Sequence, residues 1–235
     1  MHLGLIGGIG PAATVVYYQR LTDLMRKKDS RLELTIVQAD VYDLLNNNLA
    51  DLRDAQAAIY ADLIARLKAA GADCAAITSL GGHFCFPETE KISTLPLISA
   101  VTPLDAYFAA KGLNRVGLLG TEVVMRTRLY GQLEKTEAVA PDGDLIALGK
   151  LYQDMAISST CTDEQRQVFF EAGRKMVEDQ GAEAIILAGT DLNLAFDGRH
   201  NPGYPVIDAL DVHVAVLADL ASGVKTIDTL NLGQP

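Results

Sequence analysis

The sequence contains few cysteines, few basic residues and no long apolar run. Its three cysteines, Cys74, Cys85 and Cys161, are odd in number and lack metal-site spacing, so neither a disulfide framework nor a metal site is predicted. The 20 basic residues are outnumbered by 30 acidic ones, for a net charge of −10, which disfavours binding to nucleic acid or to anionic membranes. No apolar run reaches the roughly 18 residues that span a bilayer. We therefore expect a cytoplasmic protein without nucleic-acid or membrane partners.

The composition is that of a folded globular protein. Apolar residues make up 49% of the 235 residues and charged residues 21%, which excludes intrinsic disorder. At about 100–200 residues per domain, this length corresponds to one large domain or two small ones.

Short apolar runs alternate with stretches of helical periodicity, a pattern typical of βα units around a parallel sheet. We expect strands at residues 3–6, 34–37, 74–78, 115–120 and 184–187. Pro11 suits the first turn of a helix that runs to about Lys27, and Gly71 suits the end of a helix over residues 49–70. Further helices are expected at 122–135, 162–179 and 208–222, with Thr121 as an N-cap. The run Asn46-Asn47-Asn48 is interpreted as a turn and helix start.

The two halves of the chain resemble each other. Gly4-Leu5-Ile6-Gly7 is repeated 113 residues later as Gly117-Leu118-Leu119-Gly120, and Gly71-Ala72-Asp73 is repeated 110 residues later as Gly181-Ala182-Glu183. Helix–glycine–strand units look alike in many α/β proteins, but two matches at nearly one offset favour a duplicated architecture. Ligands bind at the carboxyl ends of parallel strands. A duplicated fold therefore brings two equivalent loops to opposite faces of one ligand, as two-base stereoinversion requires.

A glycine-rich loop precedes the first helix. Gly8-Ile9-Gly10-Pro11-Ala12-Ala13 fits a dinucleotide-binding pattern, but Pro11 removes a backbone donor and Asp40 lies too far along the chain for the usual ribose contact. A structural turn is a second interpretation. We favour a third, in which Gly8, Ile9 and Gly10 hold a small anionic ligand at the helix N-terminus.

Two further loops carry candidate chemistry. After the third strand, Ser79 offers a hydroxyl, Gly81 and Gly82 allow close approach of a ligand, and His83 offers an acid–base group, unless it caps the following helix. After the repeat-related strand, Gly189, Thr190 and Asp191 follow Ala188. Thr190 suits a ligand carboxylate and Asp191 suits a catalytic role, with N-capping as the structural alternative.

These segments together resemble the aspartate/glutamate racemase family. The similar segments are Gly7-Gly8-Ile9-Gly10-Pro11 with Ala13-Thr14 and Tyr17-Tyr18, Leu118-Leu119-Gly120-Thr121 with Met125 and Tyr130, Leu151-Tyr152-Gln153-Asp154-Met155, and Tyr204-Pro205-Val206-Ile207-Asp208 with His213. They span nearly the whole chain in the family's order. The resemblance implies two pseudo-symmetric parallel-sheet α/β domains with the site in the cleft between them, and a homodimer. The expected domains are residues 1–98 plus 207–235, and residues 99–206.

The resemblance also implies a reaction. Family members invert an α-carbon without a cofactor or metal, using two cysteines that flank the substrate. At the matching positions this chain has Ser79 and Gly189, and a serine hydroxyl is a far weaker acid than a thiol. We take Ser79, Asp191 and His83 as catalytic candidates. The predicted substrate-binding residues are Gly8, Ile9, Gly10, Gly81, Gly82, Thr121, Gly189 and Thr190.

Three functional interpretations follow from this resemblance and these replacements. The first is a cofactor-independent racemase that acts on a small carboxylate, an acidic amino acid, with Ser79 on one face and Asp191 or Cys85 on the other. The second is a one-base lyase, decarboxylase or isomerase on the same scaffold. The third is a carboxylate-binding protein without catalytic activity.

Overall fold

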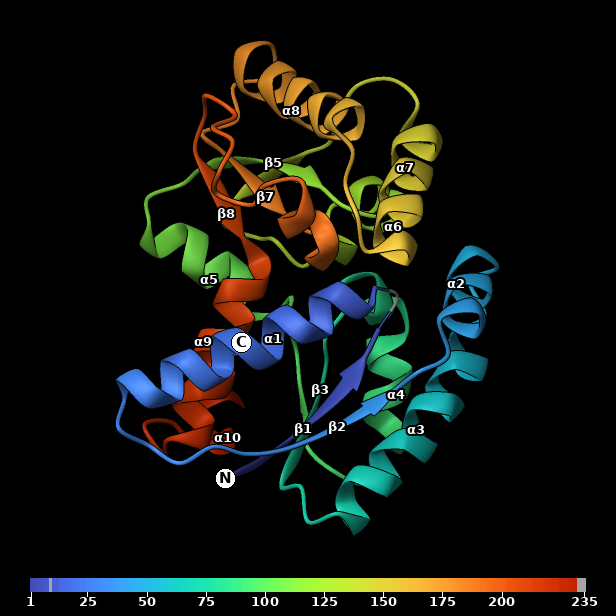
Figure 1. The fold of residues 1–235 in the computed structure, drawn as a ribbon, viewed down its shortest axis with the longest axis vertical. Coiled ribbons are helices and arrows are strands. Elements are labelled where there is room, and N and C mark those ends of the chain that lie inside the picture. The colour runs from blue at the N-terminus through green and yellow to red at the C-terminus, as the bar shows by residue number, and fades with distance from the viewer. Residues whose placement is uncertain (9, 232–235) are drawn as a thin grey trace.

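The computed structural model describes residues 1–8 and 10–231, which form two four-stranded sheets, each entirely parallel (Figure 1). The first sheet has the order β2-β1-β3-β4 and the second the order β6-β5-β7-β8. The strands of the first sheet are β1 (His2–Gly7), β2 (Glu33–Gln38), β3 (Cys74–Ile77) and β4 (Leu97–Ile98). Those of the second are β5 (Arg115–Leu119), β6 (Glu137–Val139), β7 (Ala184–Leu187) and β8 (Val206–Asp208).

Helices cover both sheets. In the first half of the chain they are α1 (Pro11–Lys27), α2 (Val41–Leu49), α3 (Arg53–Ala69), η1 (Gly81–Cys85), α4 (Phe86–Ile92) and α5 (Pro103–Ala110). In the second half they are α6 (Glu122–Arg126), η2 (Leu129–Gly131), α7 (Leu145–Ser158), α8 (Asp163–Glu178), η3 (Thr190–Leu194), α9 (Ala209–Ala221) and α10 (Ile227–Asn231). The flanking helices bury both faces of the central strands β1, β3, β5 and β7, and these strands are accordingly apolar.

Several predicted boundaries agree with the structure. Helix α1 begins at Pro11 and ends at Lys27, and Gly71 has the positive φ of 90° that suits a residue following a helix. Thr162 caps α8 through a capping box with Gln165. Thr121 caps α6 by accepting a hydrogen bond from the backbone N–H of Val124.

The duplicated architecture predicted from the sequence repeat is confirmed by the identical strand order of the two sheets. The acidic residue that ends each repeated triplet has the same local role. Asp73 accepts a hydrogen bond from the backbone N–H of His2 at the start of β1 (2.7 Å). Glu183 accepts one from the backbone N–H of Arg115 at the start of β5 (3.0 Å). The similarity between the halves therefore extends to how each central strand begins.

The two halves exchange a helix. Helix α5 follows β4 of the first sheet but packs on the second, where Leu104 and Phe108 contact the cluster that includes Leu118. Helix α9 follows β8 of the second sheet but packs on the first, in one cluster with Leu3 and Leu5 of β1. In Figure 1, α9 accordingly lies beside α1 in the lower half. We propose on this basis that the domains are residues 1–98 plus 207–235 and residues 99–206, although 232–235 lie outside the described residues.

Two predicted helices differ from the structure. The helix expected at 122–135 ends at Arg126, because the next residues, Arg128, Leu129, Tyr130 and Gly131, all have positive φ, which an α-helix does not tolerate. The helix expected at 49–70 corresponds to α3, which begins four residues later at Arg53, because Leu49 is the last residue of a separate helix, α2. The run Asn46-Asn47-Asn48 lies inside α2 rather than at a turn, because Asp40 caps a helix that begins earlier.

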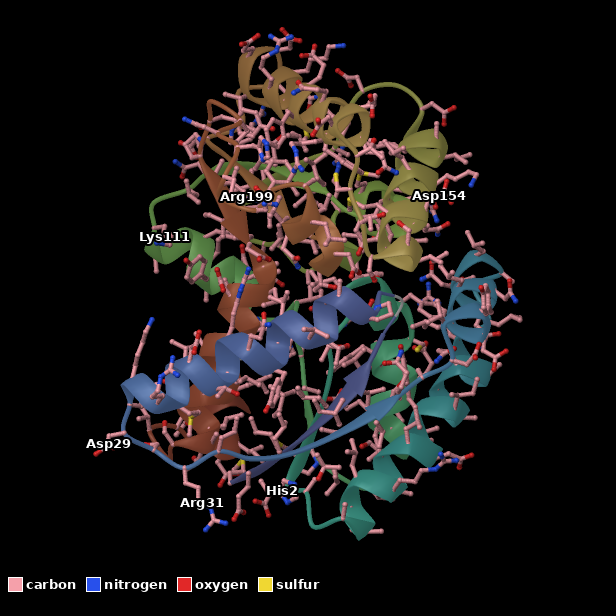
Figure 2. The ribbon with its side chains drawn as sticks, viewed as in Figure 1. His2, Asp29, Arg31, Lys111, Asp154 and Arg199 are labelled. Carbon is pink, nitrogen blue, oxygen red and sulfur yellow. The ribbon has the colours of Figure 1, made fainter. Side chains whose placement is uncertain are left out.

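Charged side chains lie at the periphery of both halves, as Figure 2 shows for Asp29, Arg31, Lys111 and Asp154. Within the described part of the chain, no helix has the length and apolar character needed to cross a membrane.

Candidate functional site

The carboxyl ends of the two central strands β3 and β7 meet between the sheets. The residue after β3 is Thr78, and Thr190 lies three positions beyond the end of β7. The Thr190 hydroxyl donates a hydrogen bond to the Thr78 carbonyl oxygen (3.3 Å), and both residues are buried. The two loops that the sequence repeat paired, one with Ser79 and one with Asp191, therefore lie against each other at the sheet edge where α/β proteins bind ligands.

Ser79 lies directly after this contact, in the first half. Its side chain is buried, and its hydroxyl accepts a hydrogen bond from the backbone N–H of Gly82 (3.3 Å). Gly8 lies so close that a Cβ atom there would be 2.3 Å from the Ser79 Cβ. The glycine loop before α1 and the loop after β3 are thus in contact. Ile9, also predicted to bind substrate, lies outside the described residues.

Asp191 places a carboxylate at the boundary between the halves. It belongs to η3 of the second half, but its Oδ1 accepts a hydrogen bond from the backbone N–H of Ala13 in the first turn of α1 (3.0 Å). Tyr152 of α7 donates a hydrogen bond to Oδ2 (3.2 Å). A Cβ at Gly10 would lie 2.0 Å from Oδ1, so only glycine allows this approach. The positive end of the α1 dipole favours a carboxylate at this point.

Burial controls the charge of Asp191. The residue is 1% exposed, and this burial raises the pKa of its carboxyl group from 3.8 to about 6, although the hydrogen bonds from Ala13 and Tyr152 act in the opposite direction. Burial disfavours a charge, while hydrogen bonds to the carboxylate favour it. Asp191 is therefore a carboxyl group that exchanges protons close to neutral pH.

Gly189 lies beside an aromatic ring. The nearest atoms to a Cβ built at this position are Cε2 and Cζ of Tyr152, at 2.5 and 2.8 Å. Tyr152 is itself buried, with 2% of its surface exposed. The space that a second catalytic cysteine would occupy is therefore filled by the ring of Tyr152, whose hydroxyl reaches Asp191 two residues further on.

His83 has both ring nitrogens bonded to backbone. Its Nε2 accepts a hydrogen bond from the backbone N–H of Ala100 (3.0 Å), and Nδ1 lies 2.7 Å from the Ser79 carbonyl oxygen. This pattern requires the neutral tautomer with the proton on Nδ1. Burial lowers the pKa of His83 to about 4, which keeps the ring neutral. The geometry thus favours a role in positioning the Ser79 backbone over the predicted acid–base role.

The remaining predicted residues have local contacts of their own. The Gly81 carbonyl oxygen accepts hydrogen bonds from the Asn48 side-chain amide (3.0 Å) and the Tyr130 hydroxyl (3.3 Å). Gly82 lies against the buried Tyr60 hydroxyl. Thr121, also buried, uses its hydroxyl to cap α6.

The cysteines do not replace the missing pair. Cys85 is buried in the hydrophobic core, where its Sγ lies 3.7 Å from the Thr89 hydroxyl, and burial raises the pKa of its thiol to about 12. Burial likewise raises the pKa of Cys74, in β3, to about 12. A thiol is nucleophilic or basic only as the thiolate, so both groups are inert near neutral pH. Cys161 precedes α8 and bonds to the neighbouring Thr162 carbonyl.

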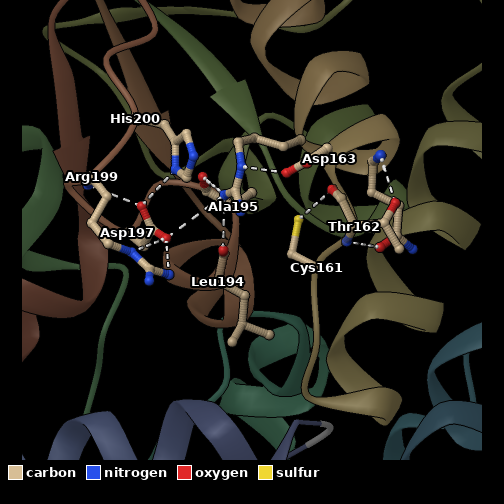
Figure 3. Close-up of polar contacts among 10 residues, drawn as sticks. Cys161, Thr162, Asp163, Leu194, Ala195, Asp197, Arg199 and His200 are labelled. Carbon is tan, nitrogen blue, oxygen red and sulfur yellow. Dashed lines mark hydrogen bonds and ion pairs between the residues drawn. The ribbon is translucent and has the colours of Figure 1, made fainter.

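An ion-pair cluster supports the segment that carries Asp191. Arg166 of α8 donates hydrogen bonds to the carbonyl oxygens of Leu194 (3.3 Å) and Ala195 (2.7 Å), at the end of η3. Figure 3 shows Asp197, a few residues further on, between Arg199 and His200. The bonds from Arg166 thus tie the end of η3 to α8. Among the described residues, no group of three or more His, Cys, Asp or Glu side chains is arranged to hold a metal ion.

Three residues of this region were not predicted from the sequence: Asn48, Tyr130 and Tyr152. Tyr130 and Tyr152 lie in segments that resemble the racemase family, so that resemblance was the available signal. Asn48 belongs to the asparagine run interpreted as a turn, and its local pattern does not indicate a contact with Gly81, 33 residues away.

Known structures share this fold over nearly the whole chain. An aspartate racemase homologue from Pyrococcus horikoshii is 24% identical, with a TM-score of 0.73 over 94% of this chain and 99% of that chain. The aspartate racemase of Picrophilus torridus is 20% identical, with a TM-score of 0.69 over 94% of each chain. A glutamate racemase from Francisella tularensis, solved in complex with D-glutamate, is 13% identical, with a TM-score of 0.63 over 93% of this chain and 80% of that one.

The sequence itself matches a family model. Residues 6–217, most of the chain, match the model of the Asp/Glu/Hydantoin racemase family. The matched range includes both strand-end loops, the glycine loop before α1 and Tyr152. The chain therefore belongs to the Asp/Glu/hydantoin racemase family.

Proposed function

We propose that this protein is a cofactor-independent isomerase of the racemase type, which removes and returns the proton at Cα of a small acidic amino acid. Its family supports this reaction class, and so do the racemases among the proteins of similar fold, one of which was solved with D-glutamate. The observation that carries the proposal is the buried carboxylate of Asp191, held between Ala13 and Tyr152 at the meeting point of the two halves.

Asp191 acts as the base in this proposal. A general base works best when its pKa is near the working pH, and burial raises the pKa of Asp191 to about 6. The Tyr152 hydroxyl holds one carboxylate oxygen and leaves the other facing the start of α1. The same environment that makes the carboxylate more basic also fixes its direction.

Ser79 acts on the other side of the site. It follows β3 as Asp191 follows β7, and its backbone carbonyl is fixed by His83. The hydroxyl donates its proton to the substrate face opposite Asp191 and takes a replacement from water, and His83 is a positioning residue. The proposed substrate-binding residues are Gly8, Gly10, Gly81, Gly82 and Gly189, through their backbone, and Thr121 and Thr190, through their hydroxyls.

A one-base reaction is the second candidate, and Gly189 favours it. This position has no side chain, its space is filled by Tyr152, and the Ser79 hydroxyl is a poor base. In a one-base lyase, decarboxylase or isomerase, Asp191 alone moves the proton. A carboxylate-binding protein without turnover is the third candidate, because α1 offers backbone donors to an anion.

Isotope exchange distinguishes these candidates. The purified protein is incubated in D₂O with L- and D-aspartate, L- and D-glutamate and hydantoins, and loss of the Cα proton is followed by NMR while chirality is followed by chromatography. We expect exchange with inversion, lost in Asp191→Asn and reduced in Ser79→Ala. The exposed Asp154→Asn, on the same helix as Tyr152, is the control that keeps activity.

Each other outcome points to a different function. Exchange without inversion contradicts the racemase and supports a one-base reaction. No exchange with any substrate, combined with calorimetric binding of one of them, contradicts proton abstraction and supports a carboxylate-binding protein.

The proposal includes a homodimer, which the family resemblance implies, and a cytoplasmic location, which the few cysteines and the lack of a long apolar run favour. Sedimentation equilibrium of the full chain measures the oligomeric state, and a monomer at micromolar concentration contradicts the dimer.

A further inference from the structure

A cavity of about 820 Å³ lies apart from the strand-end loops. It is bounded by α4, the strand β4, the start of α5, α9 with the segment that follows it, and α10. Its volume falls within the 300–1,000 Å³ typical of small-molecule sites. The cavity lies beside residues 99–102, where the chain passes from the first sheet to α5 on the second.

Apolar side chains form most of the cavity wall. They include Phe86, Leu97, Ile98 and Val216, contributed by α4, β4 and α9. β4 is the last strand in its sheet, so one side of its backbone faces no neighbouring strand among the described residues. An apolar wall with a few polar groups is the usual composition of a site for an organic ligand.

Lys225 brings an ammonium group to the cavity. Lys225 lines the cavity, and its ammonium group lies 3.4 Å from Asp219. Lys28 lies 3.0 Å from the other oxygen of the same carboxylate. Two ammonium groups thus share one carboxylate, so Asp219 neutralises Lys225 only in part. Glu90 also lines the cavity, and because Glu90 and Lys225 are both exposed, solvent screens both charges.

Ser99 adds a directed polar group. Its hydroxyl oxygen accepts hydrogen bonds from the backbone N–H groups of Val101 and Thr102, each 3.1 Å long. Within the described contacts the hydroxyl proton has no acceptor, so it remains free to bind an oxygen of a ligand in the cavity that Ser99 lines.

The cavity wall contacts the group that positions Ser79. Phe86 of the wall stacks on His83, with ring centroids 5.2 Å apart and planes 6° apart. Ala100, next to Ser99, donates its backbone N–H to Nε2 of the same imidazole. The other ring nitrogen lies 2.7 Å from the Ser79 carbonyl oxygen. A ligand that shifts Phe86 or residues 99–100 therefore moves His83 and, through it, the end of β3.

From these contacts we propose that the cavity is a second ligand site, for an organic anion with a bulky apolar body, and that its ligand acts on Ser79 through His83. The apolar body lies against the wall formed by Phe86 and Val216, the anionic group binds Lys225, and the Ser99 hydroxyl donates to a second oxygen of the ligand. The site is separate from the proposed isomerase site, and ligand binding at it does not require that activity.

A fluorescence titration tests the binding. The probe is 1-anilinonaphthalene-8-sulfonate, an aromatic anion, and laurate is the competitor. We expect saturable binding of one probe per chain that laurate displaces. Ala106→Trp fills the cavity from the exposed face of α5 and abolishes binding, whereas Ala110→Trp, on the same helix but outside the cavity lining, leaves it unchanged. Lys225→Gln weakens binding about fivefold.

The opposite results contradict the proposal that this cavity binds a ligand. Binding that does not saturate, or that is equal in Ala106→Trp and wild type, contradicts it. Circular dichroism measures whether both tryptophan variants are folded. If Ala106→Trp is unfolded, Lys225→Gln tests the site instead.

NMR of the imidazole tests the coupling. With ¹⁵N-labelled histidine, we expect the His83 ring signals to shift on saturation with laurate in wild type and to stay unchanged in Ala106→Trp. Unchanged His83 signals in saturated wild type contradict the coupling. Because neither readout uses turnover, failure of the proposed isomerase activity leaves both results interpretable.

Discussion

At the scale of single residues, the site is shaped by Gly189 and Tyr152 together. Gly189 lacks a side chain where the family resemblance implies a cysteine, and the Tyr152 ring lies in the space that a Cβ would need. The hydroxyl of the same ring bonds to Asp191. Tyr152 therefore both excludes one acid–base group and orients another, so changes at these three positions should not be additive.

A side chain at Gly189 should destabilise the protein. Gly189 has an extended backbone (φ −129°, ψ 116°), which alanine and cysteine adopt freely, so the cost is steric. We expect Gly189→Ala and Gly189→Cys to lower the free energy of unfolding by about 1–3 kcal/mol, as overpacking does. Urea denaturation measures the change, and Ser79→Cys, which is nearly isosteric, is the matched control. A Gly189→Ala variant as stable as wild type would show that the ring moves aside without cost.

The raised pKa of Asp191 predicts a pH-dependent stability difference. Below about pH 4 the carboxyl group is protonated in both the folded and unfolded states, and as pH rises through about 6 the folded state must bury a charge. The stabilising effect of the neutral form is therefore lost with rising pH. Asp191→Asn, which stays neutral, should gain stability relative to wild type between pH 4 and 7, by up to about 3 kcal/mol at 1.36 kcal/mol per pKa unit. Urea denaturation at several pH values measures the difference, and a constant difference across this range would contradict the buried charge.

Sequence reasoning identified Asp191 but not its partners. Its place after a repeat-related strand indicated a ligand-facing loop, because strand ends are where α/β proteins bind ligands. The bonds from Ala13 and Tyr152 span 178 and 39 residues, and no local period encodes such contacts. His83 shows the converse: its residue type suggested acid–base chemistry, but both nitrogens are taken by backbone groups from Ser79 and Ala100.

At the scale of elements, a left-handed turn replaces most of one expected helix. Residues 128–131 all have positive φ, a costly conformation outside glycine. The turn brings the Tyr130 hydroxyl to the Leu80 carbonyl oxygen (2.8 Å), so η2 of the second half is tied to the loop after β3 in the first. The sequence predicted a helix here, and that prediction was wrong. Local sequence patterns do not report a backbone conformation that a distant contact stabilises.

Removing this hydrogen bond should loosen the contact between the halves. Tyr130→Phe keeps the ring but removes one of the two donors to the Leu80 carbonyl oxygen, which still accepts from the backbone N–H of His83, and we expect a loss of about 1 kcal/mol in the free energy of unfolding. Tyr18→Phe, at an exposed position of α1, is the control and should change stability by less than about 0.5 kcal/mol. Equal effects of the two variants in urea denaturation would show that the bond does not stabilise the turn.

At the scale of the whole molecule, the exchange of α5 and α9 binds the two halves into one structure. The sequence repeat predicted two similar units, since Gly4–Gly7 and Gly117–Gly120 mark equivalent strands. It did not show which sheet each connecting helix covers. A helix needs one apolar face whether it packs on its own sheet or on the neighbouring sheet. The apolar pattern of α5 and α9 therefore does not indicate which sheet each helix covers.

The exchange predicts which strand each helix protects. Leu217 of α9 is fully buried with Leu3 and Leu5 of β1, although its helix follows the second sheet. We expect Leu217→Ala to cost about 2–5 kcal/mol and to speed native-state hydrogen exchange of β1 amides more than β5 amides. Leu104→Ala in α5, buried with Leu118 of β5, is the matched variant and should have the reverse effect. Amide exchange followed by NMR measures both, and faster exchange in β5 for Leu217→Ala would contradict the domains proposed as residues 1–98 plus 207–235 and residues 99–206.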